Sequence, residues 1–275
     1  MPTPSHQRVR IIGGRFRGRV MQQAVPLGQG AMAAILGLGD ADLEAACREA
    51  AQGEVVEPVN FNAPGQTVIA GNATAVARAI EAARARGAKR TVLLPVSGPW
   101  HCSLMRGAAE RLAEKLATVE VRLPNVADVY TVDVRKHASP DGIRQSLREQ
   151  LFKPVRWADT VRAMLAGGAT TFVECGPGKV LTSLNRRIGR RPDLRMLALH
   201  LRDHPRPEAH RLGVRIVHAK HVHAPLDPEE QHATQLVPQP GLVAGVEVDR
   251  VDVLVLLGRV LRELDGAVGP VQEPL

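Results

Sequence analysis

Aromatic residues are scarce in this chain of 275 residues, at 3% of the composition. With 44% hydrophobic residues, most of the chain can still bury a core, which Ala, Val and Leu must fill. The length suits one large domain or two modest ones. RNA-recognition folds stack bases on aromatic side chains, and Phe61 is the only aromatic residue in the strands predicted over residues 28–96. RNA binding of that kind is therefore disfavoured.

Long apolar runs and a cysteine framework are also missing. No stretch of about 20 apolar residues exists, so the sequence predicts no transmembrane span. Residues 1–8 lack the apolar core of a signal peptide. The three cysteines, Cys47, Cys102 and Cys175, are odd in number and far apart, which argues against disulfides. We therefore expect a cytoplasmic protein.

Charge is distributed unevenly along the chain. Residues 1–203 hold 29 Lys and Arg against 18 Asp and Glu, a net charge of +11, whereas residues 204–275 have a net charge of −3. A basic body favours acidic partners, either nucleic acid or a small acidic carrier protein.

Residues 204–275 hold 6 of the 10 histidines and 8 of the 20 prolines, which is typical of a polar, poorly ordered tail. Only residues 246–264 have the pattern of an ordered segment. No Cys, Asp or Glu stands at a metal-ligand spacing from His218, His221 and His223, so we predict no metal site.

Hydrophobic periodicity predicts a compact subdomain over residues 28–96. Its elements alternate as β-α-β-β-α-β, the order of a ferredoxin-like fold. Asp40 and Asn72 are the expected N-caps of its two helices. The predicted strands span 30–38, 55–61, 67–70 and 90–95, and the predicted helices span 40–52 and 72–86.

Larger α/β elements follow, typical of part of a parallel sheet. Helices are predicted over 103–118, 141–152, 155–165 and 176–188, and extended segments over 126–134, 171–175 and 195–200. The predicted organisation is therefore a partial α/β domain of residues 1–27 and 97–203, a ferredoxin-like subdomain of residues 28–96, and a tail of residues 204–275.

His101 is the candidate catalytic residue. It lies in the stretch Leu94-Pro-Val-Ser-Gly-Pro-Trp-His-Cys-Ser-Leu-Met105, between a predicted strand and a predicted helix. Such junctions gather functional residues in α/β folds, and imidazole titrates near neutral pH. The alternative is a capping or solvated loop histidine.

Four more segments favour the functional interpretation. They read Arg15-Phe-Arg-Gly-Arg-Val-Met-Gln-Gln, Val59-Asn-Phe-Asn-Ala-Pro-Gly-Gln, Gln150-Leu-Phe-Lys-Pro-Val-Arg-Trp157 and Val173-Glu-Cys-Gly-Pro-Gly-Lys. Together with the His101 segment they resemble the malonyl-CoA:acyl-carrier-protein transacylase family of fatty-acid synthesis, over about residues 14–201. The acyltransferase domains of polyketide synthases are similar. The resemblance implies a hydrolase-like α/β fold with a ferredoxin-like insert.

The resemblance also implies roles for three residues. His101 would act as general base and then as general acid to the leaving thiol, and a carbonyl of Gln150 would orient its imidazole. Arg17 would bind the free carboxylate of the malonyl group, because a planar guanidinium suits a carboxylate. Without the resemblance, Arg17 would be assigned to a solvated helix face beside Arg15 and Arg19.

Three further residues are expected near the site. Trp100 would fill space beside the α-carbon of the acyl group, which predicts a preference for malonyl over methylmalonyl groups. Asn60 and Asn62 are expected to brace the turn and the subdomain rather than to contact substrate.

The family nucleophile has no counterpart in the printed sequence. It lies in a Gly-His-Ser-x-Gly elbow ahead of the substrate-binding Arg, and none of the six serines here stands in Gly-x-Ser-x-Gly. We therefore expect a truncated chain that is inactive alone. Its serines are Ser5, Ser97, Ser103, Ser139, Ser146 and Ser183.

The implied substrates are malonyl-CoA and the phosphopantetheine thiol of acyl-carrier protein, with no cofactor, metal or membrane. The alternatives are a gene fragment or a non-catalytic module that binds acyl-carrier protein. Nucleic-acid binding by the basic body is a distant third.

Overall fold

The computed structural model describes residues 16–124, 130–175, 179–190 and 192–199, together with three short strands. Contacts divide the chain into two units, which are residues 1–168 with 187–190, and residues 169–186 with 191–275. Among the described residues, none of the helices has both the length and the hydropathy of a membrane span.

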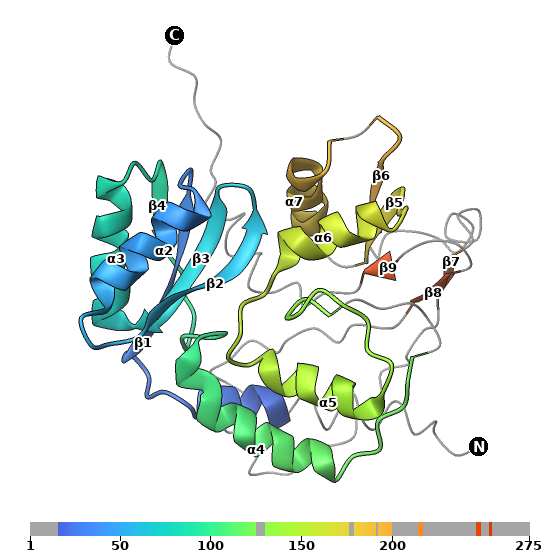
Figure 1. Ribbon diagram of the computed structural model, residues 1–275, viewed down its shortest axis with the longest axis horizontal. Coiled ribbons are helices and arrows are strands. Elements are labelled where there is room, and N and C mark those ends of the chain that lie inside the picture. The colour runs from blue at the N-terminus through green and yellow to red at the C-terminus, as the bar shows by residue number, and fades with distance from the viewer. Residues whose placement is uncertain are drawn as a thin grey trace. The chain divides into compact units, whose positions relative to one another are not determined.

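The first unit contains a four-stranded antiparallel sheet with two helices (Figure 1). The sheet order is β2-β3-β1-β4, which together with the chain order is the ferredoxin-like arrangement. The predicted subdomain fold is confirmed. The elements are β1 (Gly30–Leu36), α2 (Asp40–Ala51), β2 (Val56–Ala63), β3 (Gln66–Asn72), α3 (Ala73–Ala85) and β4 (Arg90–Leu93).

Alanine accounts for much of the core between this sheet and its helices. Ala46, Ala75, Ala79 and Ala83 are fully buried there beside larger residues such as Ile35. Side chains this small let helix backbones approach the sheet closely, so a dense core forms without aromatic residues. This packing explains how a chain with 3% aromatic residues fills its interior.

Two predicted capping side chains bond elsewhere. The prediction that Asp40 caps α2 is wrong, because Gly39 is the N-cap and Asp40 Oδ1 accepts a hydrogen bond from Thr67 Oγ1 at 2.8 Å. Asn72 does occupy the N-cap of α3, but its Oδ1 accepts from the Val55 N–H at 2.8 Å. In both cases the side-chain oxygen bonds to a partner distant in sequence and not to the helix's own amides.

A second hydrophobic cluster of the first unit includes Val20, Met105, Leu112 and Leu151. The helix predicted from residue 103 begins as a 3-10 turn. The elements are a helical segment at residues 16–22, η1 (Ser103–Met105), α4 (Arg106–Ala117), α5 (Pro140–Glu149) and α6 (Trp157–Ala166).

The extended segment predicted over residues 126–134 is wrong for residues 131–134. These residues form a turn, in which the Val134 N–H donates to the Tyr130 carbonyl at 2.8 Å. Tyr130 also forms an antiparallel bridge with Arg135, so the chain reverses within a few residues. Residues 125–129 lie outside the described residues.

The second unit contains a three-stranded parallel sheet in the order β6-β5-β9 and most of helix α7. Strands β5 and β6 match two of the strands predicted for a partial parallel sheet, whereas β9 lies in the predicted tail. The elements are β5 (Thr171–Cys175), α7 (Val180–Ile188), β6 (Arg195–Leu199), β9 (Val253–Leu254) and an antiparallel pair, β7 (Val214–Ile216) and β8 (Val246–Val248). The rest of the predicted tail, including His218, His221 and His223, lies outside the described residues.

Gly30 and Gly107 offer opposite outcomes for the same substitution. A Cβ on Gly30 would lie 2.3 Å from Cδ of Pro99, whereas a Cβ on Gly107 in α4 meets nothing within 4 Å. We expect Gly30→Ala to lower the free energy of unfolding by roughly 1–3 kcal/mol, because Pro99 must shift. Gly107→Ala should raise it by about 0.4–1 kcal/mol by restricting the unfolded chain. Urea denaturation measures both, and shifts of the same sign would contradict this packing.

Candidate active site

His101 is held by two contacts with the end of α5. Its backbone N–H donates to the carbonyl of Leu151 at 3.1 Å, and its ring Nδ1 lies 2.7 Å from the backbone carbonyl oxygen of Gln150. Gln150 is the C-cap residue of α5. A carbonyl oxygen can accept a hydrogen bond but cannot donate one. Nδ1 is therefore the donor and carries the hydrogen, and Nε2 keeps its lone pair. The structure thus places Gln150 beside His101, with the main-chain oxygen as the contacting atom.

Pro154 explains why the Gln150 carbonyl is free to accept this bond. In a continuing helix that oxygen would accept from the amide four residues later, but proline has no N–H. The next carbonyl, of Leu151, would accept from Val155, whose N–H donates instead to Val59 at 2.8 Å. Two helix-terminal carbonyls are therefore left for the two donors of His101.

The backbone of His101 has a φ of +66°, which residues with a Cβ seldom adopt. This conformation directs both its N–H and its ring toward α5. Burial, and after it the charge of Arg17, lower the pKa of His101 to about 4, while the bond to Gln150 acts in the opposite direction. At neutral pH the ring is neutral, with Nε2 as a proton acceptor.

Arg17 lies in the helical segment of residues 16–22, and its charge acts on His101. Its Nε is buried and has no hydrogen-bond partner among the described residues, and burial lowers the pKa of the guanidinium. Gly18 and Arg19 are exposed. A solvated face therefore describes Arg19 but not Arg17. A buried guanidinium without a partner is costly unless an anion pairs with it.

Three other predicted residues have a buried polar atom with no partner in the described part of the chain. These atoms are Nε1 of Trp100, Oδ1 of Asn60 and Nδ2 of Asn62. The Trp100 indole packs against the cluster that contains Val20. Asn60 and Asn62 lie on β2, where Asn60 forms a parallel bridge with Val155. Whether the two Asn residues brace the subdomain or contact substrate stays a prediction.

Glu57 was missed at the sequence level, although it contacts the His101 segment. Its Oε2 accepts from the backbone N–H of Ser103 at 3.0 Å, and its Oε1 accepts from Ser103 Oγ at 2.6 Å. One signal was available, since Glu57 is the only charged residue in the strand predicted over residues 55–61. A carboxylate in such a place requires hydrogen-bond donors.

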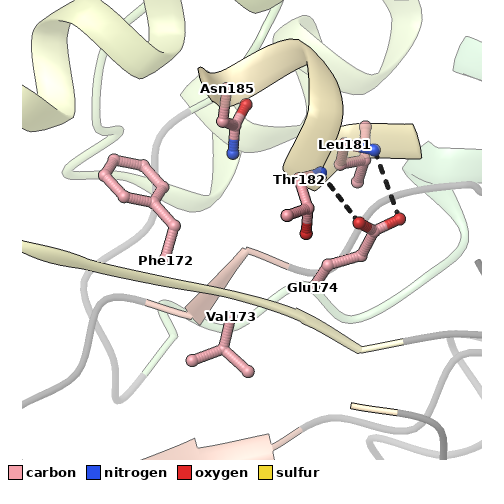
Figure 2. A pocket seen from close by; sticks show the side chains of 6 residues that line it. All are labelled: Phe172, Val173, Glu174, Leu181, Thr182 and Asn185. Atoms are coloured by element: carbon pink, nitrogen blue, oxygen red, sulfur yellow. Dashed lines mark hydrogen bonds between the residues drawn. The ribbon is translucent and has the colours of Figure 1, made fainter. Parts of the chain in front are cut away.

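A small hollow in the second unit is not a candidate site. Its volume is about 10 Å³, which is room for one water molecule at most. The Glu174 carboxylate accepts from the N–H groups of Leu181 at 3.3 Å and Thr182 at 2.8 Å, and so serves to hold the start of α7 (Figure 2). The residues that line the hollow are Phe172, Val173, Glu174, Leu181, Thr182 and Asn185.

Among the described residues, no three His, Cys, Asp or Glu side chains cluster as metal ligands would. Residues 176–178, at the start of the helix predicted over residues 176–188, lie outside the described residues.

A histidine oriented by a main-chain carbonyl, an arginine whose charge acts on it, and a ferredoxin-like insert in an α/β chain are the features that the family resemblance implied. The chain belongs to the acyl transferase domain family, which matches residues 12–224. The resemblance inferred from the five sequence segments is confirmed, and so is the fold class.

Relatives of known name are similar over part of their length. The malonyl CoA-acyl carrier protein transacylase of Escherichia coli (strain K12) is 53% identical over 180 residues, which are 66% of this chain and 58% of that protein. A crystal structure of an acyl carrier protein S-malonyltransferase from Vibrio cholerae has a TM-score of 0.67 at 49% identity, covering 69% of this chain and 61% of that one.

A third similar structure is a type II PKS acyl-carrier protein in complex with its malonyl-transacylase. It has a TM-score of 0.65 at 46% identity, covering 68% of this chain and 59% of that one. The chain thus spans about three-fifths of the length of these relatives.

Proposed function

We propose that this chain carries the base and the carboxylate-binding residue of a malonyl-CoA:acyl-carrier-protein transferase. The observation that carries the proposal is the trio of His101, Gln150 and Arg17, because it supplies an oriented neutral imidazole and a guanidinium whose buried Nε has no partner among the described residues. The names of the relatives support malonyl-CoA and acyl-carrier protein as substrates. We also propose a cytoplasmic location and no cofactor.

The proposed chemistry follows from the atoms that the site presents. Arg17 pairs with the free carboxylate of the malonyl group and so fixes the thioester. Nε2 of His101 takes the proton of a nucleophilic hydroxyl as that oxygen attacks the thioester carbonyl, while Nδ1–H stays bonded to Gln150. The imidazolium then gives its proton to the departing CoA thiolate. The same steps in reverse pass the malonyl group to the thiol of acyl-carrier protein.

A second candidate function is binding without transfer. It is favoured by one observation, the net charge of +11 in residues 1–203. In this case Arg17 and the net charge of +11 in residues 1–203 would hold an acidic carrier protein and its malonyl group. Water, which is a poor nucleophile, would then take the place of the hydroxyl that attacks the thioester.

Radiolabelled malonyl-CoA separates these functions. The 275-residue chain should bind malonyl-CoA in equilibrium dialysis and acquire no covalent label. A fusion that places a Gly-His-Ser-x-Gly segment of the family ahead of residue 12 should acquire label and pass it to holo acyl-carrier protein. Covalent label on the unfused chain would disprove the assignment of the nucleophile to that segment. Absence of binding by both proteins would disprove the transferase assignment.

Trp100 should set the selectivity of the active fusion. An extra methyl group in a filled pocket costs a factor of roughly 10–200 in kcat/KM, so malonyl-CoA should exceed methylmalonyl-CoA by about that ratio. Trp100→Ala should reduce the ratio while retaining transfer of malonyl groups. Steady-state kinetics with both substrates measure it. Equal turnover of both thioesters by the unmutated fusion would show that the indole does not border the α-carbon.

A further inference from the structure

We infer that Glu57 is a positioning residue for His101, and that it acts by holding Ser103 with both oxygens of its carboxylate. The inference deepens the proposed function, since it rests on His101 as the base of that site. It also assigns the ferredoxin-like subdomain a role in the chemistry, because Glu57 lies on β2.

The contact between Glu57 and Ser103 is specific. One carboxylate oxygen accepts from the backbone N–H at 3.0 Å and the other from the hydroxyl at 2.6 Å. Charge-assisted bonds of this kind are stronger than neutral ones, and a negative charge is favourable at the first turn of a helix. Ser103 is the first residue of η1, which continues into α4. Glu57 therefore fixes the point at which the His101 loop becomes helix.

His101 needs such a restraint because of its backbone conformation. A φ of +66° in a residue with a Cβ is retained only where the surroundings enforce it. On one side the His101 N–H is bound to Leu151 at 3.1 Å. On the other side the chain is bound at Ser103, two residues later. Loss of the contact between Glu57 and Ser103 would let the backbone of His101 relax and move the ring away from the Gln150 carbonyl.

The same strand also holds the acceptor of the imidazole. The Val155 N–H donates to the Val59 carbonyl at 2.8 Å, and the Phe61 N–H donates to the Val155 carbonyl at 3.0 Å. Val155 follows Gln150 by five residues. Strand β2 thus contacts both the segment that carries His101 and the segment that carries Gln150. Its contact with the His101 segment is made by the side chain of Glu57.

The test compares two carboxylates of the same subdomain. Glu57→Ala removes the contact with Ser103, and Glu57→Gln keeps one acceptor oxygen. The matched control is Glu54→Gln, because Glu54 also accepts from a hydroxyl at the start of a helix, Thr74 of α3, at 2.6 and 2.8 Å. Its partners do not include the His101 segment. All variants are made in the full 275-residue chain.

The readout is the nitrogen NMR spectrum of the His101 ring, assigned by comparison with a His101→Asn variant. The unmutated ring should show hydrogen on Nδ1 and titrate at about 4. In Glu57→Ala the tautomer signature should be lost, because Nδ1–H no longer has the Gln150 carbonyl as its acceptor. Glu57→Gln should give a smaller change. Glu54→Gln should leave the ring unchanged even where it lowers the melting temperature.

Two outcomes would overturn the inference: a ring signal unchanged in Glu57→Ala, or an equal change in Glu54→Gln. Where Glu57→Ala does not fold, Ser103→Ala removes only the hydroxyl bond and should shift the ring in the same direction. Dialysis with malonyl-CoA on the unmutated chain tests the proposed function separately. Failure of that binding with an intact response to Glu57→Ala would reject the substrate and retain the positioning role.

Discussion

Replacement of Arg17 by Met is expected to weaken the binding of malonyl-CoA by roughly 10- to 100-fold, because a buried hydrogen-bonded pair between guanidinium and carboxylate is lost. The same variant should be as stable as the parent or about 1 kcal/mol more stable, since Met replaces a buried charge that has no partner for its Nε. Loss of affinity combined with unchanged or increased stability is the distinctive result. Equilibrium dialysis and urea denaturation measure the two quantities.

Arg19→Met is the matched control for this substitution. Arg19 follows Arg17 by two residues and is exposed, so its replacement should leave the affinity within about twofold. Arg17→Lys should fall between the parent and Arg17→Met, because an ammonium keeps the charge and loses the planar fork. Equal losses from Arg17→Met and Arg19→Met would indicate a general charge effect and contradict a specific carboxylate site.

The second large effect concerns pH and stability. Burial and Arg17 lower the pKa of His101 from 6.5 to about 4 in the folded chain. Between these two values the unfolded chain binds more protons than the folded chain, so the free energy of unfolding falls as the pH falls. By linkage, His101 should contribute a loss of about 3 kcal/mol between pH 7 and pH 4, with no further change below both pKa values.

His101→Asn isolates this contribution. Asn also tolerates a positive φ, and its amide can donate to the Gln150 carbonyl as Nδ1–H does. Urea denaturation of both proteins at several pH values should show a difference in stability that changes by about 3 kcal/mol across this window. A difference that is constant from pH 7 to pH 4 would mean that His101 titrates normally.

The ferredoxin-like subdomain could be predicted from the sequence because its signals are local. Apolar periodicity gave α2 and α3, and glycines follow both helices with positive φ, +88° at Gly53 and +90° at Gly87. The error at Asp40 has the opposite cause. Its partner Thr67 lies 27 residues away, and no local pattern indicates that their side chains meet.

Of the candidate site, only the residues whose roles the family resemblance implied could be predicted from the sequence. Arg15, Arg17 and Arg19 look alike in the sequence, and burial of Arg17 depends on packing that the sequence does not display. The contact of Glu57 with Ser103 joins residues 46 apart, so it too required coordinates. The availability of the Gln150 carbonyl could have been read from Pro154, because proline cannot donate to it.

Because the charge of Arg17 acts on His101, a malonyl group bound to Arg17 would change the basicity of the imidazole. Burial, and after it the positive charge of Arg17, lower the pKa of the imidazole, which makes the ring a weak base in the resting protein. A malonyl carboxylate that docks on the guanidinium cancels much of that charge, and the imidazole then attracts protons more strongly. A thioester without a terminal carboxylate would leave the charge of Arg17 in place, and the imidazole would remain a weak base. If the proposed function holds, a bound malonyl group would therefore strengthen the base that acts on it.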